Sequence, residues 1–151
     1  MAWVAWVGCP LNTTRVKDYY LDTDPVAQDF LCLYNGYIHA VDDLIDKPVS
    51  DKAEAVLNVC VLHRSVMAHP FWKENATQLL LIDILIENAY RDSERLKTTH
   101  PKAARMWSMY GELMIFAVLA IVKGEDFLRK VSTAIRLANL EEQEKDVEYG
   151  K

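Results

Sequence analysis

The chain has 151 residues, of which 51% are hydrophobic and 26% charged, and this is the composition of an ordinary folded protein rather than a disordered one. A formal net charge of −5 and the lack of any cluster of Lys and Arg argue against a nucleic-acid scaffold, which needs such a cluster to bind phosphates. Three cysteines without a CxxC pair indicate neither a disulfide framework nor a zinc knuckle and favour a reducing, cytoplasmic compartment.

Apolar residues recur at intervals of three and four along most of the chain, with only five Gly and five Pro to interrupt them. This period predicts an all-α fold, namely a single domain over residues 1–151 that forms one bundle of about five to six helices. Residues 1–20 are expected to be an irregular N-terminal segment, and residues 141–151 are expected to fray because they are polar on every side.

The first predicted helix covers residues 25–46. Asp24 is a typical N-cap, Pro25 suits the first helical position, and Pro48 ends the helix. Its last turns read "HAVDDLID" and place three carboxylates within one turn.

These carboxylates, Asp42, Asp43 and Asp46, repel one another by about 0.2–0.5 kcal/mol per pair. They also lie at the negative end of the helix dipole, and no Lys or Arg occurs between Lys17 and Lys47. A divalent cation would reverse both effects, and pairs of carboxylates one turn apart suit Mg²⁺ together with substrate phosphate oxygens. The turn therefore predicts a Mg²⁺ site, with a solvated helix end as the alternative.

Asn35 and His39 follow the same three- and four-residue spacing as Asp42 and Asp46 and so share their side of the helix. We expect both to contact a substrate held by the metal. A lone His on a helix is, however, more often structural than functional.

A capping box formed by Asp51 and Glu54 starts a second predicted helix, which runs to about Met67. A third helix is predicted from about residue 75 to residue 97, and a last one begins at about residue 125 and continues into the polar C-terminus.

Within the third helix, Asp83, Glu87 and Arg91 form a row at intervals of four. Asp83 interrupts an apolar run, and a carboxylate buried there should be paired, protonated or metal-bound. We expect Asp83 and Glu87 to complete the metal site and Arg91 to meet substrate. The alternative is a simple ion pair between Glu87 and Arg91.

A fourth helix is predicted over residues 101–123, with Gly124 as its C-cap. Glu112 precedes its run "LMIFAVLAIV", and we expect this carboxylate to face the substrate cavity. The run covers ten residues, whereas about 20 are needed to cross a bilayer, so the sequence predicts a buried helix and no membrane span.

With "DDLID" at residues 42–46 near the end of an apolar helix, the chain resembles the class I terpenoid (isoprenoid) synthases. Their DDxxD motif binds Mg²⁺, which holds a prenyl diphosphate in an all-α cavity, and the resemblance assigns this role to Asp42, Asp43 and Asp46. The family's second motif, (N/D)Dxx(S/T)xxxE, is not present, and synthases of this kind are usually far longer, so the resemblance implies a shortened relative. The implied function is Mg²⁺-dependent binding or turnover of a diphosphate-containing substrate.

Two other functions stay open. The chain is similar in size to the all-α nucleotide pyrophosphohydrolases, although only Asp43 and Asp46 approach the ExxE pattern of that family. The second open function is that of a non-catalytic helical interaction protein. In that case we expect a homodimer that covers apolar residues such as Trp3 and Trp6.

Overall fold

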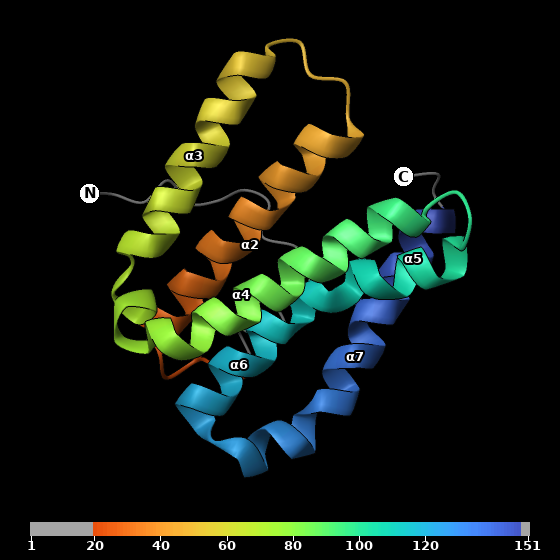
Figure 1. Cartoon of the computed structure of the whole chain (residues 1–151). Coiled ribbons are helices and arrows are strands. Elements are labelled where there is room, and N and C mark those ends of the chain that lie inside the picture. Colours follow the sequence, from red (N-terminus) through yellow and green to blue (C-terminus); the bar gives the residue numbers. More distant parts are fainter. Residues whose placement is uncertain (1–19, 149–151) are drawn as a thin grey trace. The chain divides into compact units, whose positions relative to one another are not determined.

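The computed structural model describes residues 20–148. Within this range it contains six α-helices and one 3₁₀ turn and no strand (Figure 1), which confirms the predicted all-α fold. Residues 1–19 and 149–151 lie outside the described residues, and so do Trp3, Trp6 and nearly all of the predicted irregular N-terminal segment.

The chain divides into two compact units, Met1–Ala76 and Thr77–Lys151. The described part of the first unit contains two long helices and the first turns of a third: α2 (Pro25–Asp46), α3 (Lys52–Ala68) and the start of α4 (Pro70–Leu96). The second unit contains the rest of α4 and four further elements: α5 (Pro101–Ser108), η1 (Met109–Gly111), α6 (Glu112–Lys123) and α7 (Glu125–Glu148).

The first unit is built on an antiparallel hairpin of α2 and α3 (Figure 1), and both helices begin as predicted. The Asp24 carboxylate accepts a hydrogen bond of 2.9 Å from the Ala27 N–H, and that of Asp51 accepts one of 3.0 Å from the Glu54 N–H. Each cap satisfies one of the backbone donors that a helix start leaves without a partner.

Helix α4 begins at Pro70, and a kink near the predicted start at residue 75 divides it into two helical stretches. Asn75 has a non-helical backbone (φ −123°, ψ 21°) inside α4, and its amide donates a 2.9 Å hydrogen bond to the Phe71 carbonyl. Asn side chains compete with the backbone for such bonds, so this residue marks a kink at which two helical stretches meet, and the second of them starts near the predicted position. The boundary between the two units follows one residue later.

The stretch predicted as one helix over 101–123 is divided by η1 into α5 and α6. Gly124 ends α6 as predicted, with a φ of +89° that other residues avoid. Among the described residues, Pro101–Lys123 is the one stretch long and apolar enough to cross a membrane by length and composition, a test that the core helix of a soluble protein also passes.

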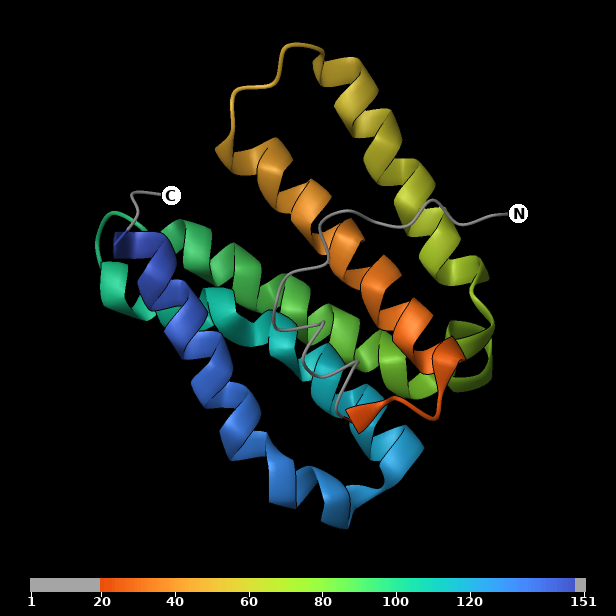
Figure 2. The ribbon, with the colours of Figure 1, turned by 180° about the vertical axis from the view of Figure 1, so that it is seen from behind.

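Each unit has its own core. In the first, the Phe30 ring lies 5.2 Å from that of Phe71 and 5.5 Å from that of His69. In the second, α6 and α7 form a hairpin (Figure 2) in which Val118 and Leu119 are fully buried.

Candidate functional site

The predicted metal-binding turn lies at the C-terminal end of α2. Asp42 is half-buried, while Asp43 and Asp46 are exposed. Lys47 reaches back to Asp43 with its Nζ 2.6 Å from Oδ1. This hydrogen bond, together with the negative charges of Asp43 and Asp42, raises the pKa of Lys47 above its ordinary value of 10.5. A cation of the chain itself therefore relieves part of the repulsion for which the sequence suggested Mg²⁺.

Within residues 20–148, no group of three or more His, Cys, Asp or Glu side chains is arranged to hold a metal ion. Asp83 is half-buried on the part of α4 that belongs to the second unit, whereas Asp42, Asp43 and Asp46 belong to the first. The magnesium site built from these residues stays a prediction.

The ion pair that the sequence offered as the alternative for Glu87 is present. Arg91 donates two hydrogen bonds to Oε1 of Glu87, from Nε at 3.1 Å and from Nη2 at 2.6 Å. Both side chains are more than half exposed, so this pair on the α4 surface contributes little to stability.

Glu112 is buried at the start of α6 and is held by two residues of α7. Its carboxylate forms an ion pair with Arg136 and accepts a 2.8 Å hydrogen bond from the Asn139 amide. The Arg136 guanidinium also lies over the Phe116 ring, 4.8 Å from its centroid. Glu112 was predicted to bind substrate, but its observed contacts join α6 to α7.

The two polar residues expected to contact substrate on α2 differ in their surroundings. His39 is exposed and Asn35 is half-buried. The Nδ2 atom of Asn35 is buried and has no hydrogen-bond acceptor among the described residues. The observed contacts do not test whether either residue binds a substrate, and that role stays a prediction.

Sequence reasoning missed the contact between His69, which is buried, and Asp29, whose side chain is 46% exposed. His69 is 5% exposed, and its Nε2 lies 3.0 Å from Oδ2 of Asp29. The Phe71 N–H donates to Nδ1 at 3.2 Å. Because Nδ1 accepts a hydrogen bond, the proton of the neutral ring is on Nε2 and is donated to Asp29.

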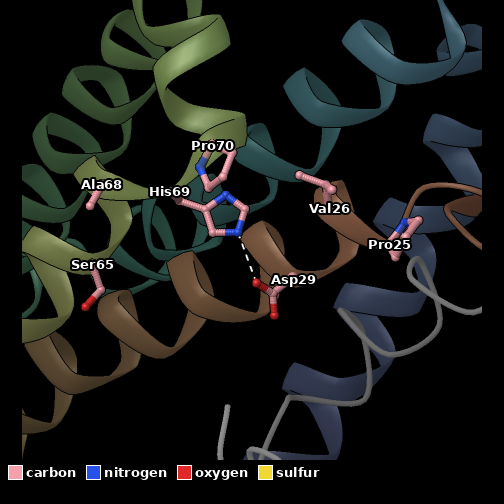
Figure 3. Close-up of a pocket in the computed structure, with 7 residues that line it drawn as sticks. All are labelled: Pro25, Val26, Asp29, Ser65, Ala68, His69 and Pro70. Carbon is pink, nitrogen blue, oxygen red and sulfur yellow. Dashed lines mark hydrogen bonds and ion pairs between the residues drawn. The ribbon is translucent and has the colours of Figure 1, made fainter. Parts of the chain in front are cut away.

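A pocket of about 730 Å³ opens beside this pair (Figure 3). Ser65 lies at the same pocket, but its hydroxyl donates to the Val61 carbonyl at 2.9 Å and points away from the imidazole (Figure 3). Both ring nitrogens of His69 are already engaged, so the ring has no lone pair left to take a proton from Ser65. The remaining walls are mainly apolar: Pro25, Val26, Ala68 and Pro70.

Helix α3 is apolar on two opposite sides. Its inner side packs on α2, and of its 17 residues only Val66 is fully buried. The opposite side, which we call the outer face of α3, is exposed and includes Leu57 at 59% and Val61 at 48% exposure. This face consists of eight exposed residues, the last of which also borders the pocket beside α2: Ala53, Val56, Leu57, Cys60, Val61, Arg64, Met67 and Ala68.

Neither periodicity nor composition distinguished the outer face from an ordinary core-facing stripe, because α3 carries apolar residues both on its inner side and on its outer face. We compared the chain with protein-family models, with curated proteins and with solved structures, and nothing in any of the three matches it.

Proposed function

We propose that the chain acts as a helical interaction protein whose contact surface is the outer face of α3. One observation carries this proposal: the outer face of α3 holds seven exposed apolar residues and one charged residue, Arg64, with Glu54 beside it in the first turn. A surface helix normally presents charged and polar residues to water, and its apolar stripe is normally covered. Isolated exposed apolar side chains are common, but a contiguous patch indicates an interaction site.

The polar groups that could perform chemistry support the same proposal, since most of them have partners within the chain. Asp43 pairs with Lys47, and Glu87 pairs with Arg91. Glu112 and His69 use their polar atoms to hold helices together.

Photo-crosslinking from the outer face tests the proposal. A benzophenone amino acid replaces Leu57 in one protein and Leu137, which is 55% exposed on α7, in a control. Both are illuminated as purified protein and in an extract of the source cells. We expect covalent adducts from position 57, absent from position 137 and lost when Val61→Glu is added. Equal labelling from both positions, or no adduct from position 57, would contradict the proposal.

A second candidate function is Mg²⁺-dependent binding of a diphosphate-containing substrate at Asp42, Asp43 and Asp46, as the resemblance to terpenoid synthases implies. It is supported by the continuity of α2 through Asp46, because an unbroken helix keeps Asp42 and Asp46 one turn apart on the same side. The nucleotide pyrophosphohydrolase alternative uses the same metal and differs in its substrate.

Thermal unfolding in chelator, in millimolar Mg²⁺ and in Mg²⁺ with pyrophosphate tests this candidate, because a ligand that binds only the native state raises its stability. A midpoint that rises with Mg²⁺ and again with pyrophosphate supports it, and prenyl diphosphates are then compared with nucleotides. The double substitution Asp42→Asn with Asp43→Asn should remove both shifts. Equal midpoints in the three solutions would exclude the candidate.

A further inference from the structure

The charges on and beside the outer face of α3 have a definite order. Glu54, Leu57, Val61, Arg64 and Ala68 are separated by three, four, three and four residues, which places them in one row along the helix. All five are exposed. The row therefore has an acidic residue in its first turn, a basic residue toward its end, and two large apolar residues between them.

We infer that the partner bound by this row is a second copy of the chain, with its α3 running antiparallel to the first. This inference rests on the proposed function and names its partner. When one copy of the row is reversed against another, Leu57 lies opposite Val61 of the second copy, and Glu54 lies opposite Arg64 of the second copy. The two-fold axis repeats both contacts, so the row is complementary to itself, as a symmetric dimer requires.

Charge selects this arrangement over the alternatives. In a parallel pairing, each Glu54 would face the other and each Arg64 would face the other, and opposed like charges are destabilising. A purely apolar partner would cover the Arg64 guanidinium without a counter-charge, which costs free energy on desolvation. Among the described residues of its own chain, Arg64 has no ion-pair partner. In the antiparallel dimer, Glu54 of the second copy supplies the carboxylate that Arg64 lacks.

The size of the contact predicts that the dimer dissociates on dilution. Helix α3 has 17 residues and is about 25 Å long at 1.5 Å per residue. A contact between two such helices falls at the small end of the range for specific interfaces. The monomer and the dimer should therefore both be observable over an accessible range of protein concentration.

Cys60 provides an independent measure of helix direction. It is exposed and lies beside the row, next to Val61. In an antiparallel two-fold pair, residues at this flanking position lie on the same side of the interface in both copies. In a parallel two-fold pair they lie on opposite sides. A short linker can therefore join the two Cys60 thiols only in the antiparallel dimer.

Sedimentation equilibrium of the full chain over a hundredfold range of concentration tests the partner and the register together. We expect the mass to rise from 17.3 kDa toward twice that value. Glu54→Arg and Arg64→Glu should each weaken the dimer at least tenfold, and the double variant should restore it, because the swapped charges again face each other. Leu57→Glu should abolish the dimer, whereas Leu137→Glu should leave it unchanged.

Crosslinking with a short bis-maleimide, in a Cys9→Ser and Cys32→Ser background, should yield a covalent dimer that Cys60→Ser abolishes. Circular dichroism confirms that each variant keeps its helices. The inference is overturned by a chain that stays monomeric at every concentration, or by a dimer that neither single charge reversal weakens. If the photo-adducts from position 57 then contain another protein, the proposed function stands without this partner; if no adducts form, both proposals are wrong.

Discussion

Three of the carboxylates that form ion pairs with basic side chains differ in their exposure to water: Asp43, Glu87 and Glu112. Asp43 and Glu87 are more than half exposed, whereas the Glu112 side chain is 8% exposed. Exposed pairs contribute little to stability because solvent screens them. A buried carboxylate loses its hydration and depends on its partners. The same chemical group is therefore a surface pair at two positions and a structural contact at the third.

At the acidic turn, Asp43→Asn should lower the pKa of Lys47 toward 10.5, because the substitution removes the carboxylate that accepts its hydrogen bond. A lysine whose pKa is raised by folding contributes stability that is fully present below pH 10.5 and is lost as the pH rises through the folded-state pKa. The difference in unfolding free energy between the wild-type protein and Asp43→Asn should therefore shrink only as the pH rises through the folded-state pKa of Lys47. Titration of the Lys47 side chain by NMR measures the pKa, and an unchanged value in the variant would contradict the observed contact.

Around Glu112 the two partners should respond unequally to substitution. Arg136→Met leaves a buried carboxylate without its cation and should cost about 2–4 kcal/mol of unfolding free energy. Glu112→Gln leaves a guanidinium that water can reach, since the Arg136 side chain is 57% exposed, and should cost about 1 kcal/mol. Urea unfolding of both variants measures the difference. A greater loss from Glu112→Gln would show that the carboxylate is more hydrated than its contacts indicate.

Helices in this chain are defined by local signals at their ends. Asp24 and Asp51 cap the starts of α2 and α3, and Gly124 separates α6 from α7. The backbone of Gly124 (φ +89°, ψ 165°) lies in a region that only glycine occupies readily. Gly111, with φ −53° and ψ −28°, lies in a region open to any residue.

The two glycines should therefore respond in opposite directions to the same substitution. Gly124→Ala should destabilise the chain by about 1–3 kcal/mol because of backbone strain. Gly111→Ala should stabilise it by about 0.4–1 kcal/mol, because alanine restricts the unfolded chain without opposing the native backbone. A new Cβ meets no atom within 4 Å at either position, so packing does not disturb the comparison. Thermal unfolding measures both changes, and a shift of the same sign in both variants would refute this explanation.

At the scale of the whole molecule, the described residues include apolar side chains that the fold leaves exposed. On α3 this surface is the outer face, and on α4 the residues from Leu80 to Leu85 include four that are 46–59% exposed. Two compact units, each with a core of its own, account for the helical fold. If the outer face of α3 binds a second copy, association contributes to the free energy of unfolding of the protein in solution.

The midpoint of thermal unfolding should for this reason depend on protein concentration. Dimerisation stabilises the native state by mass action, so a hundredfold increase in concentration should raise the midpoint by roughly 3–5 °C. Leu57→Glu should remove this dependence, while Leu137→Glu, at a site of similar exposure, should keep it. Differential scanning calorimetry at two or three concentrations is sufficient, and a wild-type midpoint that does not change would count against self-association.

The helical class and the starts of α2 and α3 were predictable from the sequence alone, because Asp24, Asp51 and the apolar period act over three or four residues. The sequence missed the short helical stretch that precedes Asn75 in α4. It also missed η1, a 3₁₀ turn that interrupts the predicted helix over residues 101–123. For the carboxylates, the sequence offered both a metal site and ion pairs, and it could not decide between them.

Only the tertiary structure decided which polar groups meet. His69 is 40 residues from Asp29, and Glu112 is 27 from Asn139, and separations of this size leave no periodic trace in the chain. The outer face of α3 was hidden for a related reason. A helix with apolar residues on two sides gives the same pattern whether one side or both are covered, and only packing against α2 shows which side the fold leaves exposed.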